Sequence, residues 1–219
     1  MTAQSTPLTR ARIALIFGGA LLAAFVVALL VTGVLWWRQA QTATPADATT
    51  LDGTLAPDFT LVNQDGQPIQ LSALRGHVVV LTFLYTTCPD ICPLTAHRLA
   101  AAYDQLTPQQ QARVRILAVT VDPERDTTTR LRQYLDANGL MGKLQFLTGQ
   151  PDQVAAVWQD YHIGVEKATP TPGANAYTVN HTAVTYILDA QGRERYLLSD
   201  ESIDPTHVAK LLARLAESS

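Results

Sequence analysis

The feature that most constrains the fold of this chain is a nearly continuous apolar run, "HVVVLTFLY", at residues 77–85. Such a run, rich in β-branched residues and without a polar face, is typical of a central strand covered on both sides. The only two cysteines of the chain, Cys88 and Cys92, follow it directly. Pro93 then suits the first turn of a helix, which we expect to end near Leu106. The sequence therefore predicts a buried strand, a cysteine loop and a helix in succession.

The remaining segments indicate one mixed α/β domain. We expect a β-hairpin around Asp65-Gly66, followed by a short helical turn capped by Ser72. The later elements, in chain order, are predicted as a strand at 113–121, a helix from Asp126 or Thr127 to about 139, a strand at 144–147, a helix at 151–162, strands at 183–188 and 193–198 joined as a hairpin, and a helix from Asp204 to about Leu215. The early crossovers imply parallel strands and the late hairpin implies antiparallel ones. This order resembles the thioredoxin-like fold, here with an N-terminal β-hairpin.

A second apolar segment lies near the N-terminus. Residues 13–37 carry no charge, and as a helix they would cover roughly 37 Å, enough to cross a hydrocarbon core of about 30 Å. A cleaved signal peptide is the alternative, because 46–48 resembles a cleavage site, but the apolar part of a signal peptide is usually only about 7 to 15 residues long. We therefore expect one retained transmembrane helix at 13–37.

The flanking charges predict how this helix is oriented. Arg10 and Arg12 precede the apolar segment, whereas Arg38 alone follows it closely. Positive charge favours the cytoplasmic side, so residues 1–12 are expected in the cytoplasm. The chain is thus predicted to be a single-pass inner-membrane protein whose globular part is periplasmic or otherwise extracytoplasmic.

The segment after the predicted helix, residues 38–56, is small and polar and reads as a linker to a domain at 57–219. All 19 acidic residues and 13 of the 16 basic residues follow Arg38, which gives this part a net charge of −6. A negative domain of this kind disfavours nucleic acid as a partner.

The cysteine pair admits three interpretations: a structural disulfide, a redox couple, or two ligands of a metal. Residues four apart lie on one face of a helix, so Cys88 and Cys92 can converge for any of the three. A helix N-terminus favours thiolates, which both a redox couple and a metal site need. A structural disulfide is disfavoured, because the loop it would close is so short that the gain in chain entropy is small.

A metal site with two cysteines usually needs a third ligand. His181 immediately precedes the strand at 183–188, which in this topology runs antiparallel beside 77–85, and this arrangement places it opposite Cys88. The other histidines, at 77, 97, 162 and 207, are expected at the far edge of the sheet or on the surface. Two thiolates and an imidazole form a soft donor set that prefers copper, especially Cu(I), although zinc also accepts such ligands. Asp122, at the end of the strand at 113–121, could orient a ligand or influence the thiolates.

These residues resemble the Sco/SenC family of membrane-anchored copper proteins. The similarity lies in "APDFTLVNQDG", "LTFLYTTCPDICP", "VTVDPERDT" and "YTVNHTAVTYILDAQG", in that order behind one N-terminal span. The resemblance implies that Cys88, Cys92 and His181 take the copper-ligand positions. It also implies copper delivery to the cytochrome c oxidase subunit with the binuclear copper centre, or reduction of that centre's thiols. One departure is Asn180, because the family commonly has an acid before its histidine.

The leading hypothesis is a membrane-anchored copper metallochaperone rather than an enzyme that turns over a substrate. Its partners would be the oxidase subunit and, in addition, other copper chaperones or thiol reductants. The alternative is a thiol-disulfide oxidoreductase in which Cys88 attacks and Cys92 resolves. The three-residue spacing argues mildly against this, since thioredoxin-like redox motifs use Cys-x-x-Cys. A thiol peroxidase is disfavoured further, because the expected Pro and Thr before the cysteine are missing.

Overall fold

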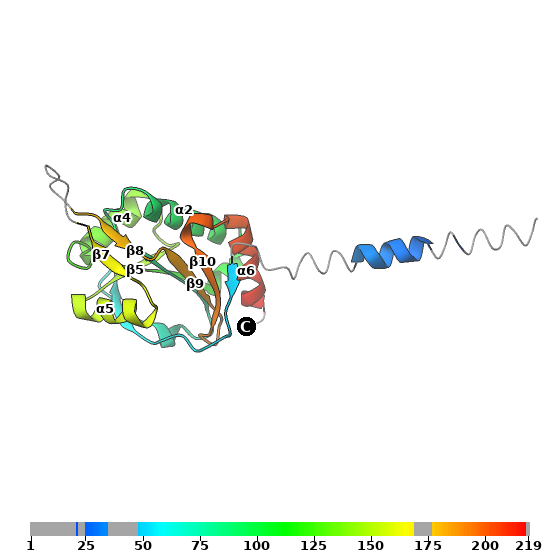
Figure 1. The fold of residues 1–219 in the computed structure, drawn as a ribbon, viewed down its shortest axis with the longest axis horizontal. Helices are drawn as coiled ribbons and strands as arrows, with labels where there is room; N and C mark the ends of the chain where they lie inside the picture. Colours follow the sequence, from blue (N-terminus) through cyan, green and yellow to red (C-terminus); the bar gives the residue numbers. More distant parts are fainter. Residues whose placement is uncertain (1–20, 22–24, 35–47, 169–176, 218–219) are drawn as a thin grey trace, which may run out of the picture. The chain divides into compact units, whose positions relative to one another are not determined.

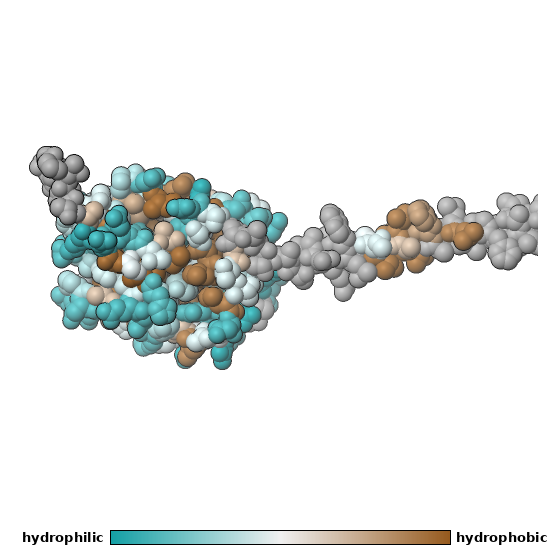
Figure 2. Space-filling model, viewed as in Figure 1, coloured by the Kyte–Doolittle hydropathy of each residue, from teal (hydrophilic) through white to brown (hydrophobic). Residues whose placement is uncertain are grey.

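The structure is a computed structural model that describes residues 21, 25–34, 48–168 and 177–217. The chain divides into two units, Met1–Thr44 and Pro45–Ser219. In the first unit, residues 25–34 are helical and form an apolar surface, with Phe25 and Leu30 more than 60% exposed (Figure 2). No helix within the described residues is long and apolar enough to cross a membrane. Most of the segment 13–37 lies outside the described residues, so the transmembrane helix stays a prediction.

An eight-stranded mixed sheet organises the second unit (Figure 1). The strand order across it is β1-β10-β9-β4-β5-β6-β2-β3. The strands are β1 (Ala48–Thr50), β2 (Thr60–Asn63), β3 (Pro68–Gln70), β4 (Val78–Leu84), β5 (Val114–Thr120), β6 (Gln145–Thr148), β9 (Val184–Leu188) and β10 (Glu194–Ser199). Strands β4, β5 and β6 run parallel, and β9 runs antiparallel to β4. This confirms the predicted mixed α/β architecture.

Strand β4 occupies the centre of the sheet. All seven of its residues are buried, as expected for a strand with layers on both faces. Leu81 pairs with Leu117 on β5 and with Tyr186 on β9. The carboxyl end of β4 therefore lies beside the beginning of β9, which is the neighbour relation that the placement of His181 requires.

Helices cover the sheet and complete the core. They are η1 (Leu71–Leu74), α2 (Ile91–Asp104), α3 (Pro108–Ala112), α4 (Thr128–Ala137), α5 (Pro151–Asp160), η2 (Asp200–Ser202) and α6 (Pro205–Glu217). Helices α2 and α6 pack against each other (Figure 1). Just after α5, the buried Tyr161 ring lies edge-on to Tyr186 and tilted against Phe83, so aromatic packing joins α5 to the sheet.

Two segments differ from the predicted boundaries. The predicted linker at 38–56 contains β1, which pairs antiparallel with β10; its small polar residues show no apolar alternation, and backbone pairing at the sheet edge defines the strand. The helix predicted to end near Leu106 ends at Asp104, but the short helix α3 that follows it was not predicted; Thr107 and Gln110 form its capping box. Ser72 accepts no capping bond and instead donates its hydroxyl to Asp58.

A two-stranded ribbon that was not predicted lies outside the main sheet, formed by β7 (Val165–Lys167) and β8 (Val179–His181) (Figure 1). Its strands pair antiparallel, with Val165 opposite His181. Each strand has three residues, which is too short for a period-two pattern to stand out. Residues 169–176, between the two strands, lie outside the described part of the chain.

Candidate metal centre

The two cysteines lie where the chain passes from the end of β4 into the start of α2. A turn closed by a 3.3 Å bond from the Cys88 amide to the Tyr85 carbonyl leads into the loop. Helix α2 begins at Ile91 rather than at the predicted Pro93, so Cys92 lies in its first turn. Both cysteines are free; Cys88 is half-buried and Cys92 is buried. The amide of Cys92 donates to the Cys88 sulfur at 3.4 Å, which holds the two side chains beside each other.

His181 comes to this pair from the ribbon. It is the last residue of β8, and β9 follows three residues later, antiparallel to β4. Its Nε2 atom lies 3.8 Å from the Cys92 sulfur. Its Nδ1 atom lies 3.0 Å from the Thr182 carbonyl, and because a carbonyl only accepts, Nδ1 carries the proton. Nε2 therefore keeps its lone pair on the side of the thiols, as a metal ligand must.

These distances suit a shared ion. For bond lengths near 2.3 Å to sulfur and 2.0 Å to nitrogen, tetrahedral or trigonal coordination separates the two donors by roughly 3.5 to 3.7 Å. The observed Cys92–His181 distance of 3.8 Å is only slightly longer. Within the described chain, no group of three Cys, His, Asp or Glu side chains is already gathered as a metal site. Binding of one ion by all three donors would therefore require small movements that bring them together.

The two thiols have opposite protonation preferences. A hydrogen bond from the Cys92 thiol, helped by backbone amides and the Tyr85 hydroxyl, lowers the pKa of Cys88 to about 5. The same shared proton, together with burial, raises the pKa of Cys92. Burial lowers the pKa of His181. These directions favour one thiolate, one thiol and a neutral imidazole at neutral pH, a set from which a soft metal would displace a single proton.

This asymmetry gives a testable pH dependence. Because the pKa of Cys88 is about 5, alkylation of Cys88 by iodoacetamide should be almost constant from pH 6 to 8. In Cys92→Ala the thiol donor is lost, so the pKa of Cys88 should rise and alkylation should become clearly slower at pH 6 than at pH 8. Mass spectrometry of the labelled peptide follows the rate. An unchanged pH profile in Cys92→Ala would refute the shared proton.

A buried carboxylate fixes the loop before the cysteines. Asp126 accepts the Thr86 hydroxyl at 2.5 Å, the Thr86 amide at 3.2 Å and the Thr120 hydroxyl at 2.6 Å. It is fully buried, and burial raises its pKa. The predicted alternative, Thr127, is the residue that caps α4. Asp126 therefore ties the cysteine loop to the end of β5.

Removing this carboxylate should destabilise the domain. Asp126→Ala leaves the Thr86 and Thr120 donors unpaired in a buried place, which should lower the free energy of unfolding by about 2 to 4 kcal/mol. Urea denaturation followed by circular dichroism measures it. The matched control is Asp136→Ala, an exposed carboxylate on α4, for which a change within about 0.5 kcal/mol is expected. Equal effects of the two substitutions would contradict this role.

Asp122, a predicted site residue, is fully buried but makes no direct bond to the three predicted donors. Its side-chain bonds in the described chain are to Arg125 and to the Tyr177 hydroxyl, and none is to a cysteine or to His181. Tyr85 was not predicted as part of the site, yet its ring lies edge-on to that of His181, with the ring centroids 6.1 Å apart. The sequence gives no sign of this role, because Tyr85 ends an apolar run and looks like one more residue of the buried strand.

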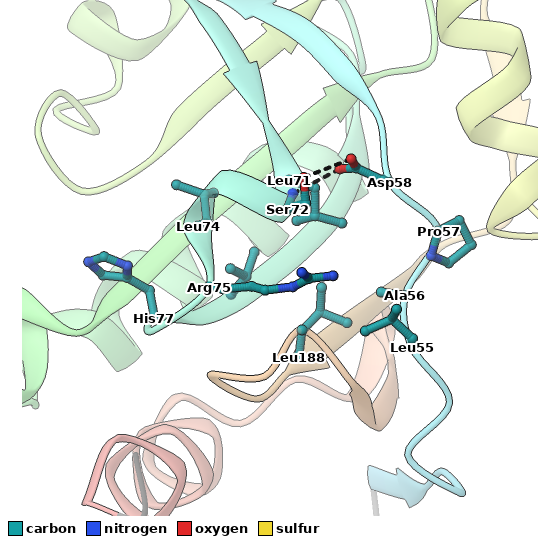
Figure 3. Close-up of a pocket in the computed structure, with 12 residues that line it drawn as sticks. Leu55, Ala56, Pro57, Asp58, Leu71, Ser72, Leu74, Arg75, His77 and Leu188 are labelled. Carbon is teal, nitrogen blue, oxygen red and sulfur yellow. Dashed lines mark hydrogen bonds between the residues drawn. The ribbon is translucent and has the colours of Figure 1, made fainter.

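The other histidines lie elsewhere. His97, His162 and His207 are exposed, and His77 contacts Arg115 at the start of β4. A cavity of about 490 Å³ opens at that same end of the sheet, lined by Arg75 and His77 among others (Figure 3). It contains none of the three predicted donors, so it is separate from the cysteine centre.

The fold and the centre together define a thioredoxin-like domain that carries two cysteines and one histidine at the carboxyl end of its central strand. The family model described as SCO1/SenC matches residues 47–217. The chain therefore belongs to the SCO1/SenC family.

Relatives and solved structures agree with this assignment. A SCO2-like protein of Rickettsia prowazekii, RP587, is 31% identical over 137 residues, which cover 62% of this chain and 64% of the relative. The chain thus matches somewhat less than two thirds of that protein's length. ScoI of Bradyrhizobium japonicum with copper bound is 29% identical, with a TM-score of 0.66 over 74% of this chain and 99% of that one. Apo Sco1 of Thermus thermophilus is 31% identical, with a TM-score of 0.67 over 81% and 99%.

Proposed function

We propose that the protein is a membrane-anchored copper metallochaperone in which Cys88, Cys92 and His181 bind one copper ion as cargo. The observation that carries the proposal is the approach of His181 Nε2 to 3.8 Å from the Cys92 sulfur, beside a second cysteine of low pKa. Two sulfurs and an imidazole bind copper well, especially Cu(I). The copper-bound ScoI relative supports copper over zinc.

The anchoring part of the proposal rests on the uncharged segment at 13–37 and on the basic residues that precede it. The exposed apolar side chains at 25–34 are consistent with a lipid environment. In this arrangement residues 1–12 lie in the cytoplasm and the domain lies in the periplasm or another extracytoplasmic space.

The proposed recipient is the cytochrome c oxidase subunit that carries the binuclear copper centre, as the family resemblance implies. The test mixes the full chain, loaded with one Cu(I), with the metal-free soluble domain of that subunit and measures copper in each after separation. Copper should move to the recipient from the wild-type chain. If copper stays with the loaded chain, or moves no faster than from a small thiol–copper complex, the chaperone role is wrong.

A second candidate function is thiol-disulfide exchange, favoured by the difference between the two cysteines. The half-buried Cys88 thiolate would attack a disulfide in the recipient and form a mixed disulfide, releasing one recipient thiolate. The Cys92 thiol, after losing its proton, would then attack Cys88 and release the second recipient thiol. The chain ends as a Cys88–Cys92 disulfide and the recipient is reduced by two electrons. Incubating metal-free reduced chain with oxidised recipient and counting recipient thiols separates this activity from copper transfer.

A further inference from the structure

The ribbon that carries His181 is not part of the main sheet. Within the described chain, β7 and β8 pair with each other and not with the eight-stranded sheet, whereas both cysteines belong to the main body of the domain. The distance between His181 and the cysteines is therefore set by the contacts that hold the ribbon in place. These contacts lie at its two ends.

The end after His181 is held by the chain itself, which runs on into the main sheet. Here the Thr182 amide donates to the Gly164 carbonyl at 3.0 Å and the Gly164 amide donates to the Thr182 hydroxyl at 3.0 Å, and these bonds join the two strands of the ribbon to each other. Strand β9 begins at Val184 and pairs with β4. This end of the ribbon is thus continuous with the sheet.

The end before His181 is held by side chains. Tyr177, four residues before His181, donates its hydroxyl to Asp122 at 2.8 Å. Arg125 donates to the Tyr177 carbonyl at 2.9 Å, and its guanidinium carbon lies 3.8 Å from the centre of the Tyr177 ring. Arg125 is also paired with Asp122. We name Asp122, Arg125 and Tyr177 the ribbon clamp.

The clamp is sheltered enough to be strong. Asp122 is fully buried, and the Arg125 side chain is 18% exposed, so their bonds are screened less than those of surface pairs. A second link between the same segments, Lys167 to Glu124 at 2.6 Å, joins side chains that are 46% and 57% exposed, and such exposed pairs contribute little. The clamp thus supplies the hydrogen-bonded side-chain attachment of the Tyr177 end. The same end is also held by the Val179 side chain, which is buried in the core, and by a 3.4 Å bond from the Val179 amide to the Tyr85 hydroxyl.

We propose that Arg125 and Tyr177 are positioning residues that hold His181 within reach of Cys92. The clamp fixes the end of β8 that the backbone leaves unattached, and it therefore limits how far the imidazole can move from the thiols. For copper binding this inference rests on the proposed function; for the placement of the ribbon it does not.

The first test uses the metal-free full chain in detergent micelles. Tyr177→Phe removes the hydroxyl bond to Asp122 but keeps the ring under Arg125, and Arg125→Lys keeps the charge but loses the planar donors. Both should raise amide hydrogen exchange in residues 178–181 while leaving the amides of β4 and β5 unchanged. The matched control is Tyr103→Phe, which removes a hydroxyl bond to the Gln111 carbonyl away from the centre. Unchanged exchange in 178–181, or an equal rise throughout the sheet, overturns the proposal.

The second test measures Cu(I) affinity in a double-mutant cycle with His181→Ala. Tyr177→Phe should weaken binding by about threefold to tenfold in the wild-type background. This is less than the full cost of one hydrogen bond to a charged group, because Arg125 still donates to the Tyr177 carbonyl and holds the ribbon in part. In the His181→Ala background it should have no further effect. Equal weakening in both backgrounds overturns the positioning role. If the wild-type chain binds no copper, the proposed function fails, and the exchange experiment still decides whether the clamp holds the ribbon.

Discussion

Replacing Cys88 by serine is expected to abolish tight Cu(I) binding. The hydroxyl of serine is a hard donor that stays protonated at neutral pH, so the site would lose its resident thiolate and half of its soft ligands. We expect the affinity to fall by more than about 100-fold, beyond the usual cost of losing a residue that merely supports a ligand. Cys92→Ser should have an effect of the same order, because both sulfurs are required as donors.

The measurement is a competition for Cu(I) with a coloured chelator under anaerobic, reducing conditions. Circular dichroism and the urea midpoint of each variant show whether the fold is retained, which matters most for Cys92 because that side chain is fully buried. If either serine variant were folded and bound Cu(I) as tightly as the wild-type chain, the two-cysteine centre would be wrong.

His181→Ala is expected to weaken Cu(I) binding by at least about 10-fold, because the loss of a direct ligand should cost no less than the loss of a residue that supports one. Two thiolates would remain, but the third donor, whose Nδ1 bond to the Thr182 carbonyl at 3.0 Å orients the ring, would be lost. The matched control is His97→Ala, which removes an exposed imidazole from helix α2 and should leave the affinity unchanged. A loss of similar size in both variants would show that His181 has no special part in binding.

The positions of the two cysteines and of His181 in the fold could be predicted from the sequence, because they follow from long strands with a clear apolar pattern. The apolar run at 77–85 marked β4, and the cysteines followed it in the chain. The placement of His181 needed the neighbour relation between β4 and β9, which the resemblance to a known fold supplied. The antiparallel pairing of Leu81 with Tyr186 bears that relation out.

The contacts that hold the ribbon could not be predicted from the sequence. Arg125 and Tyr177 are separated by 52 residues, and Asp122 and Tyr177 by 55. No local pattern relates such positions, because their bonds form only when the ribbon packs against the loop after β5. Strands β1, β7 and β8 were missed for a related reason: three residues carry too little periodicity, and tertiary pairing rather than intrinsic preference defines them.

The short strands at the two edges of the main sheet limit how the domain can associate with other proteins. The edge strands β1 and β3 are each three residues long, and β3 begins with Pro68, which has no amide hydrogen to donate. An incoming strand would find only a short template at either side, so self-association by sheet extension is discouraged. Loops and helix faces remain as surfaces that a partner can contact, and the cysteine loop at the end of β4 is one of them.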